Sequence, residues 1–104
     1  MDSKLTPAAG ATVLQDDREV RITRWDFEPG AQTGHHVHAF DYVVVPLTPC
    51  DFLLEENATQ RRTSAQAGEA YRRSAGVAHN VVNGGTTPMS FIEIEYKRRA
   101  GSVS

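Results

Sequence analysis

Short runs of strand-forming residues alternate with turn-forming residues at intervals of about ten positions, and this spacing constrains the fold more than any other feature. Val43-Val44-Val45 is an unbroken β-branched run, which is typical of a buried strand. Phe52-Leu53-Leu54 and the segment 61–66 flank Asn57-Ala58-Thr59, which predicts a hairpin. Asn83-Gly84-Gly85 is a strong turn signal, because asparagine and glycine tolerate positive φ. No segment reads as a helix of useful length, so the pattern predicts an all-β sandwich or barrel.

Two strands carry information about their faces. In the strand predicted over 19–27, Val20 and Ile22 share one face, whereas Trp25 and Phe27 share the other. This switch predicts a bulge near Thr23-Arg24, or a strand that crosses between two environments. The last strand, 89–97, alternates regularly. One face carries Ile92, Ile94 and Tyr96, and the other carries Phe91, Glu93 and Glu95.

Size and charge limit the possible functions. With 104 residues the chain is expected to form one domain, 1–104, with a core of about residues 20–97 and an extension at each end that packs against a partner subunit. No window reaches the roughly 18 apolar residues of a membrane span, and the N-terminus lacks the apolar core of a signal peptide. We therefore expect a cytoplasmic protein without a membrane partner. The formal charge is −2 and the arginine pairs are scattered, so no nucleic-acid partner is expected; the pairs are Arg61-Arg62, Arg72-Arg73 and Arg98-Arg99.

Two separate stretches contain the residues of one metal site. The first has Gly30 and His36-Val37-His38; the second has Gly68, Gly76-Val77-Ala78-His79 and Asn83. Histidines two positions apart on a strand project from the same face, and neutral imidazoles bind divalent transition metals. A pair of exposed histidines would explain the first stretch equally well. A third histidine from a neighbouring strand completes a set, so the metal site depends on the second stretch.

In order and spacing, the two stretches resemble the two signature motifs of the cupin superfamily, with Asp41-Tyr42 after the first histidine pair. The chain is particularly similar to small single-domain cupins with segments like 42–47 and 76–80, some of which are labelled β-alanine degradation proteins. The resemblance covers about residues 20–97. It implies an all-β fold, an antiparallel jelly-roll cupin β-barrel, and a homodimer.

The acidic ligand is where this chain departs from the family pattern. Where the family usually places glutamate, the chain has Tyr42 or Val43, with Asp41 one residue early. The resemblance therefore implies a site of three histidines with open positions for water or substrate. These metal ligands are His36, His38 and His79. Two alternatives stay open: a bulge could aim Asp41 at the metal, or the site could be degenerate and bind none.

The residues around the expected ligands also receive assignments. We place Tyr42 and Asp41 in the candidate substrate pocket. Tyr42 would either donate a hydrogen bond near the open coordination positions or serve as an aromatic residue of the barrel wall. His35 is adjacent to His36 on a strand and should face away from the metal. Asn83 is explained by the turn that it begins.

A metal held by three neutral imidazoles keeps its full positive charge, which favours anionic ligands. We expect one divalent transition metal per chain: Fe, Zn, Ni or Mn. With iron, the three-histidine variant of the family resembles thiol and diketone dioxygenases; with zinc, nickel or manganese, Lewis-acid isomerase or lyase chemistry is more natural. The resemblance thus implies a metal-dependent enzyme for a small polar or anionic metabolite bound in the barrel. The alternative is a non-catalytic module that binds a small-molecule ligand or metal.

Overall fold

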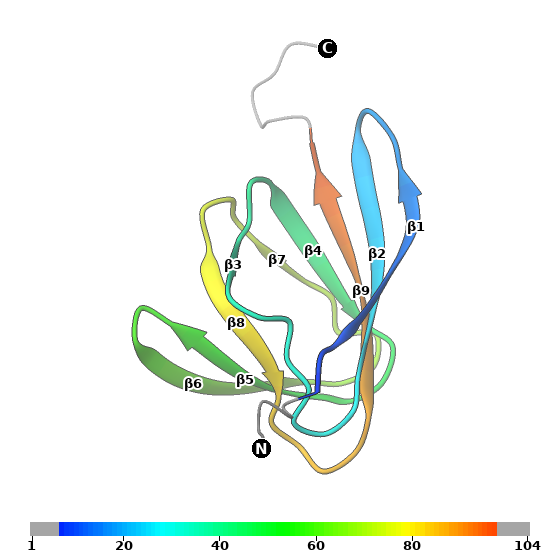
Figure 1. Cartoon of the computed structure of the whole chain (residues 1–104). Coiled ribbons are helices and arrows are strands. Elements are labelled where there is room, and N and C mark those ends of the chain that lie inside the picture. The colour runs from blue at the N-terminus through cyan, green and yellow to red at the C-terminus, as the bar shows by residue number, and fades with distance from the viewer. Residues whose placement is uncertain (1–6, 98–104) are drawn as a thin grey trace.

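The structure is a computed structural model that describes residues 7–97. These residues form nine strands and no helix, and the strands make two antiparallel sheets that face each other in Figure 1. The sheet orders are β1-β2-β9-β4-β7 and β3-β8-β5-β6. The chain thus crosses repeatedly between the sheets, and it forms the antiparallel jelly roll that the sequence predicts. The strands are β1 (Gly10–Asp16), β2 (Val20–Phe27), β3 (His36–Val37), β4 (Asp41–Pro46), β5 (Cys50–Glu56), β6 (Thr59–Ala65), β7 (Tyr71–Arg73), β8 (Ala78–Asn83) and β9 (Met89–Tyr96).

The apolar core lies between the sheets and is rich in aromatic rings. The Phe91 ring lies 5.5 Å from that of Phe27 and 5.7 Å from that of Phe52, measured between centroids. Each such buried side chain contributes roughly 1.5–3 kcal/mol to stability. In β4, burial alternates with the strand period, so Tyr42 and Val44 point inward with these rings. Some of these core residues, including Val44, Phe52 and Phe91, also line the inner cavity of the barrel.

The predicted hairpin is confirmed. β5 and β6 pair without a register break from Cys50↔Ala65 to Glu56↔Thr59, and only Asn57 and Ala58 lie between the strands. Both turn residues have positive φ, 52° and 62°, as a type I′ turn requires. This turn places Glu56, the last residue of β5, at the end of the barrel that holds the histidines.

The predicted bulge near Thr23-Arg24 is wrong. β2 pairs with β9 in continuous register, from Val20↔Tyr96 to Phe27↔Met89. The register shift lies instead in β1, between Val13 and Gln15. The outer face of β2 is half-buried at Val20 and Ile22 but exposed at Arg24 and Asp26, so the strand crosses between two environments, which is the second of the two alternatives that the sequence left open.

Two further expectations concern the ends of the chain and membranes. The predicted packing of both extensions falls on residues 1–6 and 98–104, which lie outside the described part of the chain. Within residues 7–97, no helix has the length and apolar character needed to cross a membrane.

Candidate metal centre

The three predicted histidines converge at one end of the barrel. His36 on β3 pairs directly with His79 on β8. The His38 amide donates to the Val77 carbonyl at 2.8 Å, which keeps the segment after β3 against the start of β8. As a result, the His38 Nε2 atom lies 3.0 Å from His36 Nε2 and 3.1 Å from His79 Nε2. His38 and His79 are buried and His36 is half-buried.

Hydrogen bonding orients at least one of these rings for metal binding. His36 Nδ1 lies 2.9 Å from the Gly34 carbonyl oxygen, which can only accept. His36 therefore carries its proton on Nδ1, and the Nε2 lone pair faces the other two histidines. Such an outer hydrogen bond is the usual partner of a metal-binding imidazole.

The charge state of the site also suits a cation. Burial, followed by the neighbouring His36, lowers the pKa of His38 to about 3. The same causes, in the same order, lower the pKa of His79 to about 4. Both rings are thus neutral near pH 7, as metal ligation requires.

The spacing of the nitrogens fits a single ion. An ion that binds two imidazole nitrogens at the usual distance of about 2.0–2.1 Å, roughly at right angles, holds those nitrogens about 3 Å apart. The two observed separations, 3.0 and 3.1 Å, match this value. The donor set of His36, His38 and His79 therefore fits a divalent transition metal.

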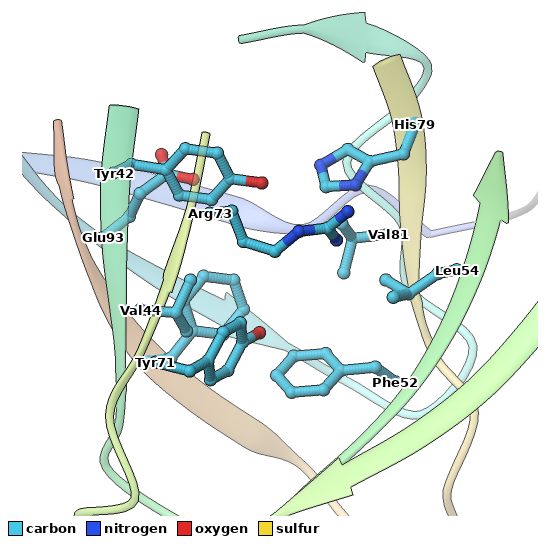
Figure 2. Close-up of a pocket in the computed structure, with 10 residues that line it drawn as sticks. Tyr42, Val44, Phe52, Leu54, Tyr71, Arg73, His79, Val81 and Glu93 are labelled. Atoms are coloured by element: carbon cyan, nitrogen blue, oxygen red, sulfur yellow. The ribbon is translucent and has the colours of Figure 1, made fainter. Parts of the chain in front are cut away.

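Tyr42 lies beside the histidines and lines the inner cavity. It is only 2% exposed, and its ring stacks on His38 with 3.9 Å between centroids. The Tyr42 hydroxyl is buried without a hydrogen-bond partner among the described residues. Figure 2 shows this hydroxyl pointing across the cavity toward His79. A buried hydroxyl without a partner is costly, so it indicates a place for a ligand atom.

Asp41 does not join the pocket. Strand alternation points Asp41 away from Tyr42, and no bulge in the β4 pairing with β9 redirects it. Its carboxylate instead accepts a 2.8 Å hydrogen bond from the Ala75 amide and lies 3.4 Å from Arg72. The expectation that Asp41 lines the pocket or assists the metal is therefore corrected.

The two remaining assignments agree with the structure. His35 is exposed, as its position next to His36 predicts. The buried Asn83 side chain accepts from the Gly85 amide at 2.9 Å and donates to the Thr87 carbonyl at 2.9 Å. Asn83 thus organises its turn, and its role is structural.

Glu93 is a site residue that the sequence does not identify. It lies on the inner face of β9, where one oxygen accepts from Trp25 Nε1 at 3.3 Å and the other lies 3.8 Å from His38 Nε2. Burial, followed by the charge of Glu95, raises the pKa of Glu93 to about 7. The alternation of Phe91 with Glu93 was the available signal, because a face that carries a phenylalanine is a candidate inner face.

Arg73 connects the site to the outside. It lines a narrow cavity of about 20 Å³ together with Tyr42, His79 and Glu93, and it also lines an outer cleft of about 270 Å³. In Figure 2 its guanidinium extends from β7 across the cavity to a position near His79. Of the two arginines of β7, Arg73 reaches the pocket, whereas Arg72 is exposed and pairs with Asp41.

Glu56 binds Arg73 and lies near His79, whose Nδ1 atom has no hydrogen-bond partner among the described residues. Its carboxylate accepts from Arg73 at 3.2 Å, and it lies 3.6 Å from His79 Nδ1 and 3.6 Å from Arg61. Burial alone would raise the pKa of Glu56, but the hydrogen bond and charge of Arg73 outweigh it and the pKa lies below its ordinary value. Glu56 is therefore an anion near neutral pH and partly neutralises two arginines.

Comparison with known proteins identifies close relatives of this chain. It is 50% identical over 91 residues to the β-alanine degradation protein BauB of Pseudomonas aeruginosa, a match that covers 88% of this chain and 96% of the relative. A cupin domain from Bordetella pertussis Tohama I is 43% identical, with a TM-score of 0.85, and the match covers 88% of this chain and 96% of that domain. No family model matches the sequence.

A more distant solved structure shares the fold alone. The polyketide cyclase RemF of Streptomyces resistomycificus is 20% identical, with a TM-score of 0.68, over 92% of this chain and 72% of that protein. At this identity the likeness shows that the same barrel carries a different sequence.

Proposed function

The chain belongs to the family of small cupins that includes the β-alanine degradation protein BauB, and from this premise we propose that it is a metal-dependent enzyme acting on a small anionic metabolite. The observation that carries the proposal is the convergence of three imidazole nitrogens, from His36, His38 and His79, beside the inner cavity that His79 lines. The proposed cofactor is one divalent transition metal per chain: Fe, Zn, Ni or Mn. Such an ion supplies Lewis acidity, and iron adds redox chemistry.

The charges at the cavity favour an anionic substrate. Arg61 and Arg73 share the single carboxylate of Glu56, which leaves an excess of positive charge where the cavity meets the outer cleft. A guanidinium binds a carboxylate through paired hydrogen bonds. Arg73 therefore anchors the anionic group of the substrate, in exchange for part of its contact with Glu56.

Tyr42 acts as a hydrogen-bond donor to the bound substrate. Burial raises the pKa of its hydroxyl above the ordinary value, so the group keeps its proton at neutral pH. Its partner-free hydroxyl points into the cavity, and its ring is fixed by stacking on His38. Aromatic and aliphatic side chains form most of the cavity wall and lower the local dielectric constant, which strengthens each polar contact inside.

The relative suggests a substrate class. BauB is described as a β-alanine degradation protein, and β-alanine is a small amino carboxylate. We extend this to the present chain and propose a small carboxylate of similar size, bound by Arg73 at one end and reaching the histidines at the other. The inner cavity of about 20 Å³ has room for little more than one water molecule, so most of such a substrate would lie in the outer cleft of about 270 Å³ that Arg73 also lines.

Turnover assays test the enzymatic proposal. Protein loaded with each candidate metal is incubated with β-alanine and related small carboxylates, while oxygen uptake and substrate loss are measured. Oxygen uptake would assign the dioxygenase class, and substrate loss without it would assign the Lewis-acid class. Replacing His36 with alanine should abolish turnover but leave a folded protein. Unchanged activity in that variant would contradict the mechanism.

The alternative function is a non-catalytic module that binds a small ligand or the metal itself. The small inner cavity is the observation that favours it, since about 20 Å³ holds one water molecule. A metal-loaded protein that binds a small carboxylate with a defined stoichiometry, but turns over none of the compounds with any candidate metal, would support this alternative.

A further inference from the structure

Glu93 is a buried carboxylate with little to offset the cost of its burial. The residue is 8% exposed, and the hydrogen bond that it accepts comes from the neutral indole of Trp25. Arg21 on the neighbouring strand β2 pairs with Glu95 at 3.5 Å, and Arg73 on β7, two strands away, pairs with Glu56 at 3.2 Å. Burying a carboxylate without a cation is unfavourable, so its position requires a reason.

The position of Glu93 supplies that reason. On β9 it lies opposite Thr23 of β2 and Val44 of β4, so the strands on both sides present uncharged residues to it. Its free oxygen is 3.8 Å from His38 Nε2, the nitrogen that also faces His36 and His79. Neighbouring ligand atoms on one ion lie about 3 Å apart, so a side-chain movement of about 1 Å brings the carboxylate into ligand distance.

We propose that Glu93 is the acidic ligand of the metal centre, supplied by the last strand in place of the glutamate that the first motif lacks. The inference rests on the proposed metal site. In this arrangement Tyr42 occupies the position of the usual glutamate in the sequence, while the carboxylate reaches the same end of the barrel from β9. Three imidazoles and one carboxylate favour harder ions such as Mn²⁺ and Fe²⁺ more than three imidazoles alone do.

Glu95 provides a matched control. It lies two residues further along the inner face of β9, and its carboxylate is also within reach of His38. It differs from Glu93 in having a cationic partner, Arg21, at 3.5 Å. Replacing either residue with glutamine removes one negative charge near the site. Only Glu93→Gln removes the proposed ligand, and glutamine keeps an oxygen that can accept from Trp25 Nε1.

Titration of the metal-free proteins with Mn²⁺ and Zn²⁺ tests the proposal. Mn²⁺ affinity should fall at least tenfold in Glu93→Gln and stay within twofold of wild type in Glu95→Gln. The Zn²⁺ affinity of Glu93→Gln should fall less than its Mn²⁺ affinity. An Mn²⁺ affinity within twofold of wild type in Glu93→Gln would overturn the proposal, as would equal losses in both variants. If the wild type binds neither ion, the metal site itself fails, and that outcome overturns the proposed function as well.

Unfolding of the metal-free proteins separates a ligand from a residue that serves only the fold. Metal-free Glu93→Gln should be at least as stable as metal-free wild type, because it retains the acceptor for Trp25 and buries no acid. A fall in Tm of more than about 5 °C in the metal-free variant would show that Glu93 is needed for folding and would overturn the proposal.

Discussion

The ring of Tyr42 lies nearly parallel to that of His38, with 3.9 Å between centroids and 22° between planes. Stacking fixes the direction of His38 and at the same time directs the Tyr42 hydroxyl into the cavity. The hydroxyl forms no hydrogen bond within the described residues, so its packing and its polar group serve different purposes. The ring supports the histidine, and the hydroxyl is available to a ligand.

Tyr42→Phe separates these two purposes. The variant keeps the stacked ring and removes a buried hydroxyl whose missing hydrogen bond costs about 1–3 kcal/mol. We expect the free energy of unfolding of the metal-free protein to stay the same or rise by up to about 1 kcal/mol, as measured with urea. Binding of a small carboxylate to the metal-loaded protein should weaken. A variant that is clearly less stable when metal-free would show that the hydroxyl has a structural partner.

Arg73 and Arg72 provide a matched pair on β7. The side chain of Arg73 is 24% exposed and lines the cavity, whereas that of Arg72 is 69% exposed and pairs with Asp41 on the outer face. Arg73→Ala should weaken binding of β-alanine or propionate to the metal-loaded protein by roughly 10- to 100-fold, because a charged hydrogen bond contributes about 1.5–3 kcal/mol. Arg72→Ala should change it by no more than about twofold. Calorimetric titration measures the carboxylate affinity of both variants. Equal losses of affinity in the two variants would mean that binding depends only on the net charge of the protein.

The metal-free protein should lose stability in mild acid. His38 and His79 have folded-state pKa values of about 3 and about 4, so at about pH 5.5, a unit below the ordinary histidine pKa, these two residues bind nearly two more protons in the unfolded chain than in the folded one. Glu93 acts in the opposite direction: its pKa is raised to about 7, so its contribution to stability is present below its unfolded value and lost as pH rises through 7. The net difference is one proton, a slope of about 1.4 kcal/mol per pH unit.

Urea unfolding of the metal-free protein at several pH values measures this slope. Glu93→Gln removes the opposing contribution, so its stability should fall about twice as steeply with decreasing pH. Equal slopes in the two proteins would contradict the assigned pKa of Glu93. A flat profile in the wild type would contradict the neutral, buried state of His38 and His79.

Several features of the site follow from local chemistry and could be read from the sequence. Histidines two apart on a strand share a face whatever the rest of the fold does, so His36 and His38 are recognisable as a pair. The turn at Asn57-Ala58 is similarly local, because the flanking strands are close in the chain. The spacing of the second stretch then identified His79, which the β3 and β8 pairing places opposite His36.

The contributions of Glu93, Glu56 and Arg73 depend on tertiary structure. Alternation shows that Glu93 and Ile94 lie on opposite faces of β9, but not which face is inside, since both carry apolar residues. The mistaken bulge near Thr23-Arg24 has the same origin, because apolar residues on the outer face of β2 resemble a switch of the inner face. Glu56 lies on β5 and Arg73 on β7, so they meet only because the two sheets pack against each other. A local sequence pattern cannot predict that contact.

The outer face of the five-stranded sheet is the expected interface of the predicted homodimer. Val43 pairs with Ile94 and Val45 pairs with Ile92 there, and all four side chains are half-buried. Ile94→Glu should therefore shift the protein toward the monomer in light scattering. Val37→Glu makes a similar apolar-to-acid change at an exposed position of the other sheet and should leave the mass unchanged. A monomeric wild type would refute the homodimer, and an unchanged Ile94→Glu dimer would place the interface elsewhere.

Metal analysis of protein purified without added metal or chelator tests the central claim most directly. The wild type and His35→Ala should each contain close to one transition-metal ion per chain, whereas His36→Ala and His79→Ala should contain almost none while remaining folded. Anomalous scattering from crystals of the wild type should place the ion among the three Nε2 atoms. A wild type that holds no ion even after incubation with Fe²⁺, Zn²⁺, Ni²⁺ and Mn²⁺, or histidine variants that retain it, would contradict the claim.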